Sequence, residues 1–290
     1  MNPKELLVAG TKTAVLGIYP SDELAGGAPN GSASTWAVPA YQTGSLRPGH
    51  AGAFPLAAKY HPQWIRDNAL GQNTLCQVES LVRHLPLRAG MRVLDLGCGK
   101  GTSSIFMARE FGIEAWAVDQ ATCPTEIRQR AIDLGCEGTV FPLTAEAHSL
   151  PFAKEFFDAV IAIDSFHYFG TDERYLEYVM QFIKPGGFIG VVDIAFTREL
   201  RCTGDAPEYL RQKYPKHWSF VHTAEWWKQH WEKTGLVDMV CAELLPDSAD
   251  LLRNYVEDRP PEQDADCIMQ AVPQDHTGLI ALVCLVARKR

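Results

Sequence analysis

The chain has 290 residues and a formal net charge of −8, with 46 % apolar and 21 % charged residues. This is the composition of a globular protein long enough for one large α/β domain, and no apolar run reaches the ~18 residues that a transmembrane helix needs. An acidic chain gains nothing from the phosphate field of a nucleic acid, and the N-terminus lacks the apolar segment of a secretory signal. We therefore expect a cytoplasmic protein that binds neither a nucleic acid nor a membrane.

The eight cysteines are scattered along the chain, and no CxxC motif occurs. Most of them lie in apolar stretches, which is typical of buried thiols in a reducing compartment and not of a disulfide framework. The histidines show no HxxxH spacing either. We therefore expect the reaction to require no metal ion.

The first 60 residues show no helical or strand period. Residues 21–55 are rich in Gly, Pro, Ala and Ser, which is typical of a linker, but Trp36, Tyr41 and Phe54 favour packing against a domain. A mobile segment with apolar side chains can serve as a lid, so we predict that residues 20–65 order over the active site when a ligand binds. The alternative is a permanently packed extension.

Residues 63–200 alternate regularly between helical and strand patterns. The helix expected at 172–183 carries Leu176, Val179, Met180 and Ile183 on one face. Strands that are nearly continuous apolar runs between helices indicate a parallel sheet covered on both faces. The expected helices are 73–85, 102–111, 124–134 and 172–183, and the expected strands are 91–96, 113–119, 139–143, 158–164 and 188–194.

The last 90 or so residues lose this rhythm. A polar insertion at 201–222 precedes a tryptophan-rich helix at 223–233, for which Thr223 is the expected N-cap. Strands at 236–244 and 279–287, around a helix near 250–256, predict an antiparallel terminal hairpin on the sheet edge.

The strongest motif is Val93-Leu-Asp-Leu-Gly-Cys-Gly-Lys-Gly101, in which an apolar strand runs into a glycine-rich turn. Glycine permits positive φ and lets a ligand approach the backbone, and the following helix offers free N–H groups. The GxGxG spacing differs from the GxGxxG of dinucleotide sites. Acidic residues accompany it: Asp95 within the strand, Asp119 at the end of the next strand and Glu146 after the third.

This series resembles the class I S-adenosylmethionine (SAM)-dependent methyltransferases, in particular the small-molecule branch that includes ubiquinone and menaquinone biosynthesis enzymes. The resemblance covers roughly the middle half of the chain. It implies an α/β, Rossmann-like, doubly wound and mostly parallel seven-stranded sheet with an antiparallel terminal hairpin. The domain would span 66–290, after an N-terminal extension or lid at 1–65, and would include a substrate-side insertion at 196–222. The matching segments are 91–101, 119, 145–152, 156–168 and 183–193.

The resemblance implies that SAM is the cofactor and that its methionine part lies against the glycine turn, formed by Gly97, Cys98, Gly99 and Gly101. Asp95 would lie near the SAM ammonium group. The alternative for Asp95 is a purely structural carboxylate that bonds the turn. Lys100, which differs from the small or polar residue of many relatives, would point to solvent.

The resemblance assigns the nucleoside part to the ends of the next strands. Asp119 would hold the ribose and Gln120 would flank the adenine, whose amino group Glu146 and the Ala147 backbone would accept. Asp164 would lie beside the methyl donor. The alternatives are that Asp119 is a helix N-cap and that Glu146 is a solvated loop residue.

Candidate catalytic residues follow the fourth strand, at Asp164, His167 and Tyr168. The ordinary pKa of histidine lies near neutrality, so His167 is suited to remove a proton from an acceptor, and Tyr168 can bond the donor or the substrate. The alternative is that both side chains pack and cap locally. An Asn-Pro-Pro-Tyr or Asp-Pro-Pro-Tyr sequence, found in many enzymes that methylate planar amino groups, is missing, which favours a small metabolite.

Aromatic residues outside the alternating core are candidates for the walls of the site. They are Tyr60, His61 and Trp64 before the first helix, and Trp218, His222, Trp226 and Trp227 after the fifth strand. For the tryptophans, packing of an amphipathic helix is the competing interpretation.

Taken together, the sequence predicts SAM-dependent transfer of a methyl group to an O, N, S or C nucleophile of a small molecule by in-line displacement. The alternatives are an aminopropyl or other non-methyl transferase on the same fold, and a non-catalytic SAM-binding subunit or sensor. The sequence leaves the acceptor and homo-oligomerisation open.

Overall fold

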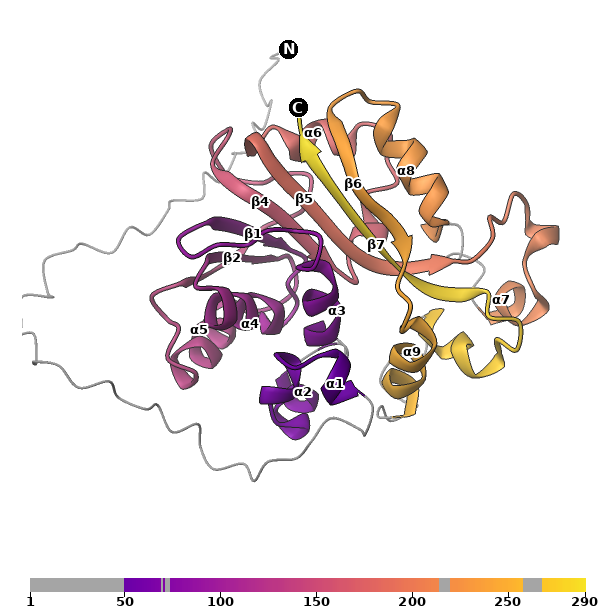
Figure 1. Cartoon of the computed structure of the whole chain (residues 1–290), viewed down its shortest axis with the longest axis horizontal. Helices are drawn as coiled ribbons and strands as arrows, with labels where there is room; N and C mark the ends of the chain where they lie inside the picture. The colour runs from indigo at the N-terminus through magenta and orange to yellow at the C-terminus, as the bar shows by residue number, and fades with distance from the viewer. Residues whose placement is uncertain (1–49, 69, 71–73, 214–219, 258–267) are drawn as a thin grey trace, which may run out of the picture. The chain divides into compact units, whose positions relative to one another are not determined.

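The computed structural model describes residues 50–68, 70, 74–213, 220–257 and 268–290 (Figure 1). Within them the chain forms a seven-stranded sheet in the order β3-β2-β1-β4-β5-β7-β6. The first five strands are parallel, and β7 is antiparallel to both of its neighbours. The strands are β1 Arg92–Leu96, β2 Glu114–Asp119, β3 Val140–Thr144, β4 Phe157–Ile163, β5 Ile183–Phe196, β6 Val237–Leu244 and β7 Ile280–Lys289.

Successive residues of a strand point to opposite faces of the sheet, and in the buried strands the residues on both faces are apolar. Helices therefore cover both faces. Val93 packs in the cluster under the helices α3, α4, α5 and α9, whereas Leu94 packs in the cluster under α6 and α8. The doubly wound architecture predicted from the sequence is confirmed. The helices are α1 His50–Ala53, α2 Pro62–Asn68, α3 Thr74–Leu81, α4 Thr102–Phe111, α5 Pro124–Asp133, α6 Tyr175–Met180, α7 Glu208–Lys213, α8 Ala224–Glu232 and α9 Ser248–Glu257.

One boundary differs clearly from the sequence prediction. Strand β5 begins at Ile183, inside the segment expected to end a helix, because Ile183 pairs with Phe157 before the register shifts. The late strands form an antiparallel pair at one end of the sheet, as predicted, with β7 next to β5 and β6 at that edge. The predicted cap of α8 is correct, since Thr223 Oγ1 accepts from the Trp226 amide at 3.1 Å.

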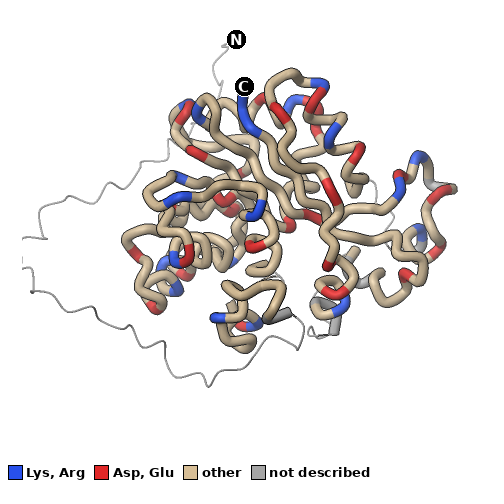
Figure 2. The backbone as a smooth tube through the Cα atoms, in the orientation of Figure 1, with Lys and Arg blue, Asp and Glu red and all other residues tan. Residues whose placement is uncertain are grey.

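Charge is evenly mixed, with acidic and basic residues interspersed along the described backbone (Figure 2). Among the described helices, none is both long and apolar enough to cross a bilayer.

The described end of the predicted lid is part of the core. Phe54 is fully buried, and Tyr60 packs on Phe106 with ring centroids 5.4 Å apart. The buried carboxylate of Glu79 on α3 accepts from the Ala57 amide at 2.8 Å and from the Leu56 amide at 3.1 Å. Residues 54–60 are therefore packed on the domain, as the alternative to the lid predicts. Residues 20–49, with Trp36 and Tyr41, lie outside the described residues, and movement of that segment stays a prediction.

Replacing Glu79 by glutamine is expected to lower the free energy of unfolding by about 1.5–3 kcal/mol, because a charged acceptor of two amides becomes neutral and one of its oxygens becomes a donor. Urea unfolding measures this. The matched control is Glu177→Gln, on an exposed position of α6, which is expected to change stability by less than about 0.5 kcal/mol. Equal unfolding midpoints for the two variants would show that Glu79 does not anchor this segment.

Candidate active site

A cavity of about 510 Å³ opens at the carboxyl ends of the parallel strands. Its lining comes from the ends of β1 and β2, from the residues that follow β1 to β4 and from the last part of β5, with Leu70, Val221 and Ile268 added from other segments. The sheet order reverses between β1 and β4, and ligands of open α/β sheets bind at this switch point.

The glycine turn leaves little room for side chains at any of its three glycines. At Gly99, with φ +53°, a Cβ would come within 2.7 Å of the end of the Leu70 side chain. Gly97 has φ +76°, and a Cβ there would come within 2.5 Å of Ser165 Cβ. Gly101 has φ +78°, and a Cβ there would come within 2.5 Å of Ile127 on α5. Gly97 and Gly99 line the cavity, whereas Gly101 packs the turn against α5. The predicted Cys98 is buried and is not part of the lining.

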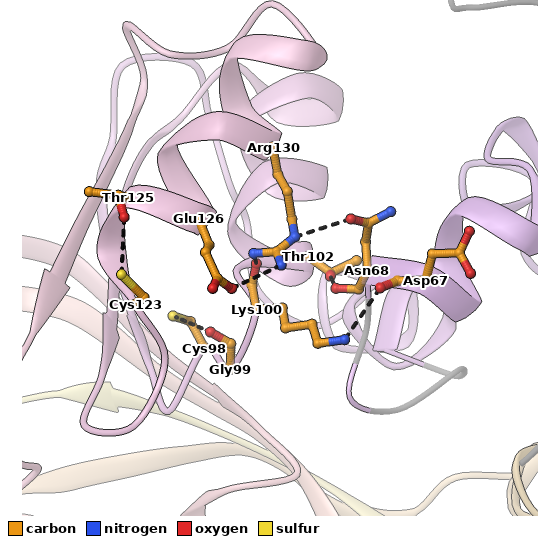
Figure 3. A network of polar contacts seen from close by, with 10 residues as sticks. All are labelled: Asp67, Asn68, Cys98, Gly99, Lys100, Thr102, Cys123, Thr125, Glu126 and Arg130. Atoms are coloured by element: carbon orange, nitrogen blue, oxygen red, sulfur yellow. Dashed lines mark hydrogen bonds and ion pairs between the residues drawn. The ribbon is translucent and has the colours of Figure 1, made fainter. Parts of the chain in front are cut away.

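Side chains from two helices hold the outer side of this turn (Figure 3). Arg130 of α5 donates to Asn68 Oδ1 at 3.1 Å and to the carbonyl of Lys100 at 3.4 Å, and the hydroxyl of Thr102 donates to the carbonyl of Asn68. Lys100 Nζ donates to the carbonyl of Asp67 at the end of α2, 3.3 Å away, so it does not simply point to solvent as predicted. The turn is thus fixed to both α2 and α5.

Asp95 lies beneath the turn and is not in the cavity lining. It is fully buried, and its Oδ2 accepts from the hydroxyls of Ser103 and Ser104, both at 2.5 Å. Burial, only partly offset by these hydrogen bonds, raises the pKa of Asp95 to about 6. In this structure Asp95 orders the start of α4, whereas the structural alternative placed its hydrogen bonds in the glycine turn. Its Oδ1 has no partner among the described residues, and its place beside the SAM ammonium group stays a prediction.

Asp119 ends β2 at the cavity, and Gln120 follows it in the lining. One carboxylate oxygen of Asp119 accepts from the Gly99 amide at 3.0 Å, and the other from the Ala121 amide at 2.8 Å and the Thr122 amide at 2.9 Å. Helix α5 begins at Pro124 with Cys123 as its N-cap, so Asp119 does not cap it. The carboxylate instead ties the glycine turn to the end of β2.

Glu146 and Ala147 also line the cavity, on the loop after β3. Glu146 is bound to its neighbour His148, whose ring Nδ1 lies 2.7 Å from one carboxylate oxygen and whose amide donates to the other at 2.8 Å. The hydrogen bond from His148 lowers the pKa of Glu146. The carbonyl of Ala147 accepts from the Tyr175 hydroxyl at 3.0 Å. The loop is therefore held in place beside the cavity.

The three predicted catalytic residues come together after β4. Asp164 has φ +52°, a conformation that non-glycine residues rarely adopt and that is common at functional sites. Its Oδ1 accepts from the side chain of the buried Gln77 on α3 at 3.1 Å. The exposed ring of Tyr168 lies over that of His167, with centroids 3.9 Å apart. All three residues line the cavity.

His167 has a partner that the sequence analysis missed. Its Nδ1 lies 2.7 Å from Oδ1 of Asp193, and its amide donates to Oδ2 at 2.8 Å. Asp193 is 1 % exposed, and also accepts from the Ile194 amide at 2.8 Å. Burial lowers the pKa of His167, but the carboxylates of Asp193 and Asp164 raise it, and the net result is above 6.5. The available signal was a lone acid in the apolar run 188–196, because a buried charge needs a partner.

The predicted aromatic walls are mostly not at the cavity. Trp227 is buried in the core, and His222 pairs with Glu199 at 2.7 Å while stacking on Trp226 at 3.6 Å. Tyr60, His61 and Trp64 likewise do not line the cavity, whose outer side carries Leu70 instead. Trp218 lies outside the described residues.

Comparison with known proteins agrees with this geometry. Residues 93–187 match the family model described as a methyltransferase domain. Methyltransferase GfsG of Streptomyces halstedii is 31 % identical over 117 residues, which are 40 % of this chain and 42 % of that protein. The 27-O-demethylrifamycin SV methyltransferase of Amycolatopsis mediterranei is 29 % identical over 136 residues, 46 % of this chain and 50 % of that protein.

The chain thus spans about half the length of these curated relatives. Among solved structures, Haemonchus contortus phosphoethanolamine N-methyltransferase 2 in complex with SAM superposes with a TM-score of 0.62 at 20 % identity, covering 79 % of this chain and 56 % of that one. The resemblance to SAM-dependent methyltransferases predicted from the sequence is confirmed, and the described residues have the expected fold.

Replacing Gly97 by alanine is expected to lower the free energy of unfolding by about 1–3 kcal/mol more than Gly90→Ala does. Both glycines have positive φ, +76° and +80°, but only at Gly97 would the new Cβ meet another atom within 4 Å. Chemical unfolding of the two variants separates backbone strain from the clash with Ser165. Equal losses of stability in the two variants would mean that Ser165 moves away from the new Cβ without any loss of folding free energy.

Proposed function

We propose that the protein transfers the methyl group of SAM to a hydroxyl oxygen of a small-molecule acceptor. The observation that carries the proposal is the juxtaposition in one cavity of the glycine turn, the Asp119 carboxylate and the buried His167–Asp193 pair. The glycine turn and the Asp119 carboxylate suit a nucleoside with a charged tail. The His167–Asp193 pair suits removal of a proton from the acceptor.

The cavity fits SAM in both size and chemistry. Its volume of about 510 Å³ lies within the range of ~300–1,000 Å³ typical of small-molecule sites. Gly97 is a position where the backbone itself must form the wall, since a Cβ has no room there. Asp119 would accept the ribose hydroxyls, Glu146 and Ala147 would contact the adenine, and Asp164 would lie near the donor methyl. When bound, SAM supplies a methyl group already activated by its positive sulfur.

The His167–Asp193 pair supports an oxygen acceptor. Because the Asp193 carboxylate only accepts, the Nδ1–H of His167 donates to it and leaves the lone pair on Nε2. A base of this kind can take the proton from a hydroxyl as the oxygen attacks the methyl carbon, and the imidazolium that results is stabilised by Asp193. An O-methylating relative, the rifamycin enzyme, agrees with this assignment.

The test uses the purified full-length protein. Calorimetry should detect SAM binding, and incubation with methyl-labelled SAM and a metabolite extract should yield a labelled product whose methyl group is attached to oxygen. Transfer of a larger group would favour the aminopropyl alternative. Tight SAM binding without any transfer would favour a binding subunit, and failure to bind SAM would refute the proposal.

A further inference from the structure

A second cluster of reactive side chains lies apart from the cavity. The ligand-capable atoms of His84, Cys241 and Cys284 all lie within 4.8 Å of one another. His84 follows the end of α3, Cys241 is on β6 and Cys284 is on β7. None of the three lines the cavity. Two thiols and an imidazole gathered from three separate elements are a set of donors that the scattered sequence positions gave no reason to expect.

The register of β6 and β7 explains how the two thiols meet. Glu243 is paired directly with Cys284, and Cys241 with Val286. Residues two apart on a strand point to the same face, so Cys241 and Glu243 share a face with Cys284. Both cysteines belong to the core cluster on the α3 side of the sheet. His84 is carried to the same face at the end of α3, which packs against β7 (Figure 1).

A fourth donor lies beside these three. Glu243 Oε1 is 3.5 Å from Nε2 of His84. The two sulfur atoms are buried, whereas the side chains of His84 and Glu243 are 33 % and 57 % exposed. The cluster therefore has an apolar floor made of thiols and a solvent-facing side made of an imidazole and a carboxylate, through which an ion can enter.

The chemistry of the four groups selects the ion. Two sulfurs, one nitrogen and one oxygen are a donor set that Zn²⁺ takes in tetrahedral geometry, whereas Mg²⁺ and Ca²⁺ prefer oxygen alone. A disulfide is disfavoured, because diagonal cross-strand neighbours such as Cys241 and Cys284 have Cα atoms ~7–8 Å apart, beyond the usual span of the bond.

We propose that His84, Cys241 and Cys284, with Glu243 as the fourth ligand, form a structural zinc site that fastens the end of α3 to β6 and β7. On binding, the two thiols lose their protons to solvent and the sulfurs coordinate as thiolates. All four positions of the ion are filled by protein, so the site has no open position for a substrate. It takes no part in methyl transfer, and the expectation of a metal-independent reaction is unaffected.

The site would also stabilise the cavity from a distance. Helix α3, whose end it holds, carries Gln77, which donates to Asp164, and Glu79, which anchors residues 56 and 57. An ion that binds only the folded chain stabilises it by an amount that grows with the logarithm of its concentration above the dissociation constant. Zinc is therefore expected to raise the melting temperature of the whole domain.

The experiment uses the full chain purified without chelators. Elemental analysis should find a single zinc ion per chain, and replacement by Co²⁺ should give a thiolate-to-metal charge-transfer band with the visible spectrum of a tetrahedral ion. Cys241→Ser and His84→Asn should weaken zinc binding by at least about 100-fold, since loss of a mere outer-shell partner costs ~10–100-fold. The matched control, Cys136→Ser, removes a buried thiol elsewhere in the core and should bind zinc as the wild type does.

The proposal would be overturned by a protein that neither retains nor binds zinc, by equal zinc affinity of wild type and Cys241→Ser, or by a melting temperature unchanged between zinc and chelator. Recovery of a Cys241–Cys284 disulfide from the untreated protein would also overturn it. His84 is partly exposed, so the His84→Asn variant is expected to fold and keeps the test decisive if a cysteine variant does not.

Discussion

Replacing His167 by asparagine is expected to reduce turnover with SAM and the acceptor by about 10²–10⁴-fold, the usual contribution of a general base. Asparagine can still donate to Asp193, so the local packing is preserved, but it has no basic nitrogen to take the acceptor's proton. The dissociation constant for SAM is expected to stay the same, because His167 acts on the acceptor. Steady-state kinetics and calorimetry measure the two quantities separately.

The same prediction fixes the direction in which the rate changes with pH. The neutral imidazole is the active form, so the rate falls as pH drops below the pKa of His167, which the neighbouring carboxylates hold above 6.5 in spite of burial. Asp193→Asn removes the nearer charge. The acidic limb of the profile should therefore move to lower pH in that variant, while the maximal rate decreases because the imidazolium loses its stabilising partner.

The matched control for His167 is His148→Asn, since His148 also lines the cavity and also pairs with a carboxylate, but on the exposed side. It should keep its turnover within a few-fold of the wild type. If His167→Asn retained full turnover, the pair with Asp193 would be structural, and the acceptor would need no base from this side chain.

The second large effect is expected on SAM binding. Asp119→Ala should weaken it by about 2–4 kcal/mol, or roughly 30–700-fold in dissociation constant, through the loss of two charge-assisted hydrogen bonds to the ribose. The same carboxylate accepts from the amides of Gly99, Ala121 and Thr122, so part of the loss comes from a less ordered turn.

Asp119→Asn separates the two contributions, because it keeps one accepting oxygen but loses the charge. It should fall between the wild type and Asp119→Ala. Glu114→Gln, at the other end of β2, makes the same change of charge away from the cavity and serves as the control. A dissociation constant that does not change in Asp119→Ala would remove Asp119 from the cofactor site.

Periodicity and glycine spacing were enough to predict the sheet, since burial on both faces leaves apolar runs that few other folds need. Helix α4 was placed at both ends, because Gly101 and Gly112 mark them. The glycine turn, Asp119 and the residues after β4 were predicted to lie together, because the carboxyl ends of parallel strands share one edge. These are local patterns with one dominant physical cause.

The rest depends on contacts between distant residues, which periodicity does not encode. Asp193 lies within an apolar strand of the sequence, and only its short distance to the His167 ring in the structure shows that the two residues pair. The thiols of Cys241 and Cys284 are 43 positions apart, and they meet through strand register. Asp95 is of a residue type that often binds ligands, yet its carboxylate accepts hydrogen bonds from two serines in the first turn of α4. The sequence could not decide whether the aromatic residues of α8 pack in the core or line the cavity, because both environments favour aromatic side chains.

The position of β7 sets the order in which the protein can be built. It is the last strand along the chain, yet it is inserted between β5 and β6 and pairs with both of them. During synthesis, β1 to β5 can assemble with their helices as each leaves the ribosome, but β6 has no partner until residues 280–289 emerge. Residues 280–289 thus bring both β7 and β6 into register with the five strands that can already pair without them. Until then, the β7-facing side of the Val192–Ile194 backbone, which carries Asp193, is an open edge, so the residue that pairs with His167 lies on a strand that β7 has yet to cover.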